Sequence, residues 1–196
     1  RGGASAAYGV TPDLWCFGKV IGGGLPVGAV GGSAELLSCL APTGPVYQAG
    51  TLSGNPLATA AGRAVLDHVV DDDYSVLINR TTRFAADLAS AMTGGGLSAR
   101  TTCVGPLIGL LIGPPGSVLS EPMDYEDVKK VANNGVYGAL FHALLRRGVM
   151  LPPGPYEVLF PGFAHGQPEL AFAIDAAGEA AAEVAASWPE EGGPSR

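Results

Sequence analysis

A run of glycines shortly after a single lysine constrains how the first part of this 196-residue chain can fold. Lys19 is followed by three glycines at 22–24, inside the otherwise apolar segment 15–32. Consecutive glycines interrupt regular structure, and they let the backbone bend and approach a neighbouring segment closely. We therefore expect a turn between two short strands at 13–17 and 27–32, with Lys19 just past the end of the first strand.

Lys19 is also chemically unusual in this chain. The only other lysines are Lys129 and Lys130, and the rest of the positive charge is arginine. Arginine keeps its charge in proteins, whereas a buried lysine amine can be neutral and act as a nucleophile or base. The carboxyl ends of strands in open α/β sheets are also where ligands bind. Two interpretations stay open for Lys19, which are covalent chemistry on a carbonyl group and an unreactive surface lysine.

Local signals predict the remaining elements. We expect the side chains of Leu14, Trp15 and Phe17 to point inward from the first strand. Asn55 as N-cap and Pro56 at the first helical position predict a helix whose apolar stripe comprises Leu57, Ala61, Ala64, Val65 and Val69. Further helices are expected at 34–40, 74–92, 124–147 (interrupted at 133–135) and 168–188, with loops at 1–12 and 114–122. Further strands are expected at 98–104, 107–112, 149–151 and 157–160, the first two of these forming a hairpin through Gly105-Pro106.

This order of elements predicts an α/β chain in two parts. Residues 1–73 form a sheet-and-loop part, residues 74–188 form a small α+β part, and residues 189–196 form a frayed tail. The chain starts without methionine and without a signal-peptide profile, so we expect a fragment of a longer protein.

Composition excludes several classes of function. With 47% hydrophobic residues the chain can build a substantial core, and its net charge of −7 argues against nucleic acid or an anionic membrane as partner. The three cysteines are widely spaced without a Cys-x-x-Cys pair, so we expect no metal site and a reducing, cytoplasmic location. No apolar stretch is long enough to span a membrane.

Other candidate sites are weaker. The spacing around Lys19 fits neither the phosphate loop of NTPases nor the dinucleotide-binding glycine pattern. Cys16 has no histidine near it in sequence, so a small buried hydrophobe is the favoured interpretation. The histidines His68, His142 and His165 and the acidic run 71–73 are interpreted as structural or solvated, although His165 follows a strand-like segment near Glu157.

Two further positions keep alternative interpretations. Thr51 and Ser53 lie in a glycine-rich loop before a helix, where hydroxyls, free N–H groups and the helix dipole favour an anion such as phosphate. Ordinary turn chemistry with a helix cap accounts for the same residues. Glu157 is the lone charge in 156–160, so it either faces a cleft or is an exposed strand residue.

Three motifs resemble one enzyme family. They are Thr11-Pro-Asp-Leu14, Gly18-Lys-Val-Ile-Gly-Gly-Gly-Leu-Pro-Val-Gly-Ala29 and Pro45-Val-Tyr-Gln-Ala-Gly-Thr-Leu-Ser-Gly-Asn-Pro56. They are similar to the glutamate-1-semialdehyde 2,1-aminomutases, which belong to the class III aminotransferases of fold type I and use pyridoxal 5′-phosphate (PLP). Segments 141–151 and 157–165 match the family more weakly. The resemblance implies the C-terminal part of a fold type I large domain at 1–73, followed by a small C-terminal domain at 74–188.

The resemblance also implies roles for individual residues. Lys19 holds PLP covalently through its amine and moves a proton between the substrate carbon and the cofactor. Gly50 and Thr51 reach the phosphate in the site of a partner subunit, which implies a homodimer. Tyr47 and Glu157 line a substrate pocket. In this family glutamate 1-semialdehyde is converted to 5-aminolevulinate, the tetrapyrrole precursor.

Two departures from the family pattern leave alternatives. The family's aspartate for the pyridine nitrogen, its stacking aromatic residue and its phosphate loop lie upstream of the lysine and are not in this chain, so we expect little independent activity. The residues of segments 151–156 and 160–163 differ from the usual aminomutase sequence. The alternatives are a class III transaminase that acts on two different molecules, and an inactive remnant that serves only as a dimerisation module.

Overall fold

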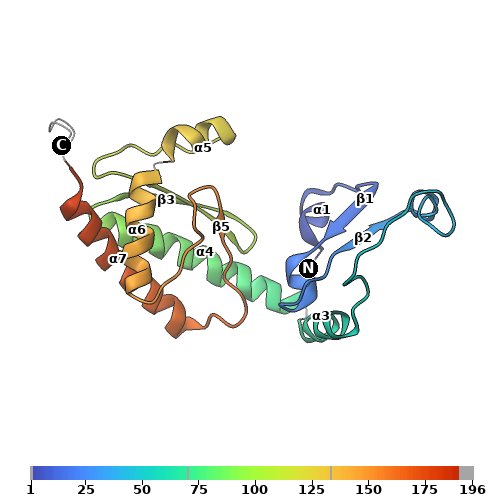
Figure 1. Ribbon diagram of the computed structural model, residues 1–196. Coiled ribbons are helices and arrows are strands. Elements are labelled where there is room, and N and C mark those ends of the chain that lie inside the picture. The colour runs from blue at the N-terminus through green and yellow to red at the C-terminus, as the bar shows by residue number, and fades with distance from the viewer. Residues whose placement is uncertain (1, 70, 133, 190–196) are drawn as a thin grey trace. The chain divides into compact units, whose positions relative to one another are not determined.

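The computed structural model describes residues 2–69, 71–132 and 134–189. The chain divides into two units, Arg1–Tyr74 and Ser75–Arg196, and each contains both helices and strands (Figure 1).

Two short strands and a turn form the centre of the first unit. Strand β1 (Leu14–Phe17) pairs antiparallel with β2 (Ala29–Gly32), and Phe17 lies opposite Ala29. A short 3₁₀ helix, η1 (Lys19–Gly22), follows β1. Gly22 is therefore helical, although we expected irregular structure at this glycine. The predicted position of Lys19 just past the first strand is confirmed.

The prediction that Leu14, Trp15 and Phe17 point inward is wrong. Leu14 and Phe17 are each 50% exposed, and Trp15 is only half-buried. The alternation of a strand sets which side chains share a face, but burial also needs a second layer packed on that face. In the described part of the first unit the sheet has two strands, and β1 packs chiefly on β2.

The helices of the first unit are short apart from the last. Helix α1 (Gly3–Tyr8) lies where a loop was expected, and α2 (Ala34–Leu37) is shorter than predicted. Helix α3 (Pro56–His68) starts as predicted, because Asn55 Oδ1 accepts hydrogen bonds from the N–H groups of Leu57 and Ala58 at 3.0 and 3.1 Å. The predicted stripe is only partly correct: Leu57 and Ala64 are exposed, whereas Ala58 and Gly62 are buried.

A three-stranded antiparallel sheet, in the order β3-β4-β5, forms one layer of the second unit. The predicted hairpin is confirmed: β3 (Ser98–Val104) pairs with β4 (Leu107–Gly113), and Val104 lies opposite Leu107. Strand β5 (Val158–Leu159) adds two residues on the other edge of β4.

Three helices, α4 (Asp71–Gly94), α6 (Asn134–Arg146) and α7 (Gln167–Ser187), cover one face of this sheet. Helix α5 (Tyr125–Val131) contacts β4 but contributes no residue to the core. Asp124 caps α5 as predicted, because its Oδ1 accepts from Asp127 N at 2.9 Å; of the expected interruption at 133–135, residue 133 lies outside the described residues. Ile108, Leu110 and Ile112 alternate along β4 and pack in one core with residues of α4, α6 and α7. The helices therefore pack on the face of the sheet that these three side chains share.

The predicted strand at 149–151 is absent, and the one at 157–160 is reduced to β5. At Val149 the backbone N–H bonds to the end of α6 and not to a neighbouring strand. Val149 N donates to Leu144 O at 3.0 Å and closes the end of α6 beyond Gly148, whose φ is 83°. Pro152 and Pro153 have no N–H to donate to a ladder. Leu151 is nonetheless buried in the core. Of the expected tail at 189–196, residues 190–196 lie outside the described residues.

Two absences concern the described residues only. None of their helices has both the length and the apolar character needed to cross a membrane. They also hold no cluster of three or more His, Cys, Asp and Glu side chains suited to a metal ion.

The buried hydroxyl of Thr81 on α4 gives a first prediction. Thr81 is fully buried, and its Oγ1 has no hydrogen-bond partner among the described residues. An unpaired buried hydroxyl costs about 1–3 kcal/mol, so Thr81→Val is expected to raise the free energy of unfolding by about 1 kcal/mol. Urea unfolding checks this, with Thr82→Val as control, since the exposed Thr82 hydroxyl donates to Ile78 O at 2.9 Å. A loss of stability in Thr81→Val larger than in the control would contradict the prediction.

An ion-pair network between α6 and α7 gives a prediction on pH. Glu183 accepts from Arg147 Nη1 at 2.7 Å and from Arg146 Nη2, and Arg147 Nε also pairs with Glu179 at 3.3 Å. Hydrogen bonds from Arg147 and then Arg146 lower the pKa of Glu183 from its ordinary value of 4.5.

Because the folded-state pKa of Glu183 is depressed, its contribution to stability is present above pH 4.5 and is lost as pH falls through the folded value. Glu183→Gln is therefore expected to reduce stability at neutral pH and to flatten the fall of unfolding free energy on acidification. Denaturant unfolding between about pH 7 and about pH 3 measures both effects. The exposed Asp175 on the same helix supplies the control Asp175→Asn; equal acid profiles for the two variants would refute the assignment.

Candidate functional site

The turn at Lys19 has a strained backbone. Lys19 has a φ of 52°, and among the described residues it is the one position other than glycine with a positive φ. A side chain with a Cβ rarely adopts this region, and such strain persists only where the surroundings hold it. Here Gly23 N donates to Val20 O and Leu25 N donates to Gly22 O, both at 3.0 Å.

Two glycine contacts hold this turn against α3. A Cβ on Gly62 of α3 would lie 2.0 Å from Ile21 O, and a Cβ on Gly23 would lie 2.7 Å from Ala61 O. Real Cβ atoms do not approach so closely, so both positions require glycine for the backbones to touch. This contact fixes the Lys19 turn relative to the loop at the start of α3.

The amine of Lys19 is uncommitted. Lys129 pairs with Glu126 at 3.7 Å and Lys130 with Asp127 at 2.9 Å, but Lys19 makes no ion pair or side-chain hydrogen bond with any described residue. Lys19 is exposed in this structure rather than enclosed by its apolar sequence neighbours. No described side chain therefore competes for Nζ with an aldehyde or another bound molecule.

The loop before α3 offers hydrogen-bond donors, although not those of the helix itself. Asn55 Oδ1 already takes the N–H groups of Leu57 and Ala58, so the free N–H groups expected here lie in the loop and not in the first turn of the helix. Among the described residues, the N–H groups of Thr51 and Leu52 and the hydroxyl of Thr51 have no partner. These donors, rather than the helix terminus, suit a phosphate.

A groove of about 640 Å³ lies beside this loop. One wall is the segment leading into β2, at residues 26–29, and the other comprises Gly50, residues 52–55 and Thr59. Of the predicted site residues, Gly50 lines the groove, whereas Lys19, Tyr47 and Thr51 do not. Tyr47 is 82% exposed.

Glu157 belongs to the second unit, where it directly precedes β5. It is exposed, and its N–H donates to Gly154 O at 3.3 Å. Its charge acts on Tyr137: burial, and then the neighbouring carboxylate of Glu157, raise the pKa of Tyr137 to about 12. The Tyr137 hydroxyl donates to Pro152 O at 2.8 Å.

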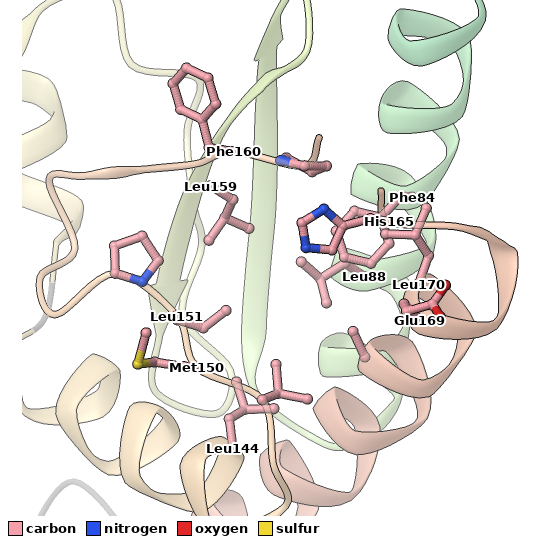
Figure 2. Close-up of a pocket in the computed structure, with 14 residues that line it drawn as sticks. Phe84, Leu88, Leu144, Met150, Leu151, Leu159, Phe160, His165, Glu169 and Leu170 are labelled. Atoms are coloured by element: carbon pink, nitrogen blue, oxygen red, sulfur yellow. The ribbon is translucent and has the colours of Figure 1, made fainter. Parts of the chain in front are cut away.

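An apolar pocket of about 190 Å³ lies in the same unit (Figure 2). Its walls include Phe84, Leu88, Leu144 and Leu170, and the two titratable side chains that line it are His165 and Glu169. His165 has a partner: its Nδ1 accepts from Gly162 N at 3.0 Å. This bond agrees with the structural interpretation of His165.

The cysteines and the other two histidines do not form part of either pocket described above. Cys16, Cys39 and Cys103 are exposed free thiols, and burial of part of its surface raises the pKa of Cys103. The expected burial of Cys16 is therefore wrong. His68 is exposed at the end of α3, and His142 is exposed on α6 with its ring edge-on to Phe141.

Sequence reasoning missed Arg80 and Tyr137. Arg80 on α4 donates to the carbonyl of Gly162, 82 residues further along the chain, and Tyr137 donates to the carbonyl of Pro152. Neither residue belongs to a recognisable motif, and no spacing pattern reports such distant partners.

The comparisons with known proteins agree on one family. The family profile described as "Aminotransferase class-III" matches residues 1–150. A glutamate-1-semialdehyde 2,1-aminomutase from Salinibacter ruber is 43% identical over 178 residues, which cover 86% of this chain and 38% of that protein. This chain thus spans about two fifths of the length of the curated relatives it matches.

Solved structures show the same likeness. An omega-transaminase from Sphaerobacter thermophilus matches with a TM-score of 0.76 and 29% identity, over 93% of this chain and 41% of that chain. A lysine-to-alanine variant of a glutamate-1-semialdehyde-aminomutase from Pseudomonas aeruginosa PAO1, in complex with PMP, matches with a TM-score of 0.75 and 25% identity, over the same shares. The α/β fold therefore matches that of PLP-dependent transaminases.

The close contact between the Lys19 turn and α3 gives a prediction. In Gly62→Ala the new methyl group would overlap Ile21 O, so the turn must shift, and the free energy of unfolding is expected to fall by about 1–3 kcal/mol. Hydrogen exchange at residues 19–24 and urea unfolding measure the change. The control is Gly138→Ala on α6, where a Cβ meets no atom within 4 Å and stability should hold or rise. Indistinguishable effects of the two variants would contradict the contact.

Proposed function

The chain belongs to the class III aminotransferase family, and we propose that it is part of a PLP-dependent aminomutase that converts glutamate 1-semialdehyde to 5-aminolevulinate. The relatives named glutamate-1-semialdehyde 2,1-aminomutase support this substrate, at 40–43% identity over most of this chain. The observation that carries the proposal is the uncommitted amine of Lys19, which lies directly after β1 on a strained turn held by glycine contacts.

The residues present fit two groups of PLP, its aldehyde and its phosphate. An aldehyde requires an amine without a competing ion pair, which Lys19 supplies. A phosphate requires donors that are not already used, which Thr51 and the loop N–H groups of Thr51 and Leu52 supply. Gly50 has no side chain; a Cβ there would lie 2.9 Å from Ser53 Oγ. Bound PLP supplies an electron sink for negative charge that develops on a substrate carbon.

Lys19 has two tasks in this proposal. Its Nζ would hold the cofactor covalently, and as a free amine it would carry a proton between the substrate carbon and the cofactor. Both tasks need Nζ at a fixed place, and the backbone contact of the turn with Gly62 supplies that constraint. Loss of the lysine side chain removes both tasks together.

The other site residues have supporting roles. Tyr47 and Glu157 bind the substrate. Gly50 and Thr51 bind the PLP phosphate in the site of a partner subunit, so the active protein is a homodimer. Residues 1–73 are part of the cofactor-binding large domain, and residues 74–188 form the small C-terminal domain. The three free cysteines support a reducing, cytoplasmic location. The likeness to glutamate-1-semialdehyde 2,1-aminomutases supports a role in tetrapyrrole biosynthesis.

A second candidate is an intermolecular transaminase. The likeness to an omega-transaminase, at 29% identity, favours it, as do the unusual residues of 151–156 around Glu157. The two reactions differ in what they consume. An aminomutase exchanges amino and oxo groups within one molecule, whereas a transaminase needs a separate amino acceptor.

Assaying the complete protein with glutamate 1-semialdehyde alone separates the two. The aminomutase proposal predicts 5-aminolevulinate without any added amino donor or acceptor. Turnover that starts only when a second amino or oxo compound is added would favour the transaminase and overturn the aminomutase.

Removing the lysine tests its role in the complete protein. Lys19→Ala is expected to lower kcat by at least about 10³-fold, because attachment and proton transfer are both lost. The control is Lys129→Ala, which removes an exposed lysine paired with Glu126 and should leave kcat unchanged. Turnover of Lys19→Ala within about tenfold of wild type would overturn the assignment.

A further inference from the structure

The segment 152–163, here called the Glu157 strap, carries Glu157 with little regular structure of its own. Within it only Val158 and Leu159 form a strand, with Leu159 opposite Ile108 and Val158 opposite Gly109. Two paired residues are a weak hold on a segment of this length. The position of Glu157 therefore depends on what fixes the strap at its two ends.

The upstream end is fixed from α6. Tyr137 is 3% exposed, and its hydroxyl donates to Pro152 O at 2.8 Å. Burial and the charge of Glu157 raise the pKa of Tyr137 to about 12, so the phenol keeps its proton and stays a donor. The residue that accepts this hydrogen bond, Pro152, lies five residues before Glu157 along the strap.

The downstream end is fixed at Gly162. Arg80 Nη2 on α4 donates to Gly162 O at 3.2 Å and to Phe163 O at 3.5 Å. His165 holds the same glycine twice: its Nδ1 accepts from Gly162 N at 3.0 Å, and its backbone N–H donates to Gly162 O at 3.1 Å. Both backbone polar groups of Gly162 are therefore satisfied, although no ladder pairs them.

The acceptor of the Gly162 N–H is Nδ1, the ring nitrogen nearer the backbone, so this bond does not use Nε2. Figure 2 shows the His165 ring beside the apolar pocket, with Glu169 of α7 on the same rim. The ring thus reaches from just before α7 back to the strap, where its Nδ1 accepts the Gly162 N–H.

We propose that His165 is a positioning residue, which, with Arg80 and Tyr137, fixes the strap so that Glu157 meets the substrate. The inference rests on the proposed substrate-binding role of Glu157. His165 acts through the backbone of Gly162 and does not itself touch the reacting atoms. Arg80 supports the carbonyl side of the same glycine, and Tyr137 supports the opposite end of the strap.

Three substitutions of His165 separate this role from loss of bulk. His165→Asn keeps an acceptor, Oδ1, at the same number of bonds from Cα as Nδ1. His165→Gln places its acceptor where Nε2 was, out of reach of the Gly162 N–H. His165→Ala removes both. His142→Ala is the matched control, because His142 is an exposed histidine that packs on Phe141 and not on the strap.

The first readout is amide hydrogen exchange across 157–165 in the complete protein. We expect exchange about three- to tenfold faster in His165→Ala and His165→Gln, which is the change that loss of one net hydrogen bond gives, and near wild type in His165→Asn and His142→Ala. Equal exchange in the alanine, glutamine and asparagine variants would overturn the proposal.

The second readout is kinetic. His165→Ala and His165→Gln are expected to raise KM several-fold with a smaller change in kcat, with recovery in His165→Asn, and to have little further effect in a Glu157→Gln background. If Glu157→Gln raises KM and His165→Ala does not, the positioning role is overturned. If Glu157→Gln leaves KM unchanged, the proposed role of Glu157 has failed, and the exchange pattern alone then decides whether His165 holds the strap.

Discussion

The contact between the Lys19 turn and α3 is the constraint on which the first unit depends. Two backbones touch there because Gly23 and Gly62 have no side chains, and a Cβ at Gly62 would meet Ile21 O at 2.0 Å. The contact holds Lys19 at a φ of 52°, a conformation that a lysine does not adopt without support from its surroundings. Chemistry at Nζ needs that fixed origin, because a long side chain on a loose turn would not hold a reacting atom in place.

The second unit uses a different device for the same purpose. Its core is well packed around β4 and three helices, but Glu157 lies outside it, on a strap with only two paired residues. Side-chain hydrogen bonds to backbone carbonyls and to one amide replace the missing ladder, from Tyr137 at one end and from Arg80 and His165 at the other. A strap held in this way can vary in sequence around Glu157 while its ends stay fixed. This tolerance agrees with the departure of residues 151–156 from the usual aminomutase sequence.

Local signals predicted much of this fold. The Asn55 cap, the Gly105-Pro106 hairpin and the Asp124 cap each depend on neighbouring residues, and each is confirmed. Burial was harder to predict. Leu14 and Phe17 are three residues apart, so they lie on opposite faces of β1, and both are half-exposed because burial is decided by a second layer and not by the strand itself. The position of Lys19 followed from its glycines, whereas Arg80 and Tyr137 find partners far along the chain, which no local pattern encodes.

The central claim is that the amine of Lys19 carries the cofactor. The most direct measurement is borohydride reduction of the complete protein in the presence of PLP, followed by peptide mapping. The account predicts a single phosphopyridoxyl group on the peptide that contains Lys19. Label on the peptide that holds Lys129 and Lys130, or no label on the Lys19 peptide in a protein that binds PLP, would contradict it.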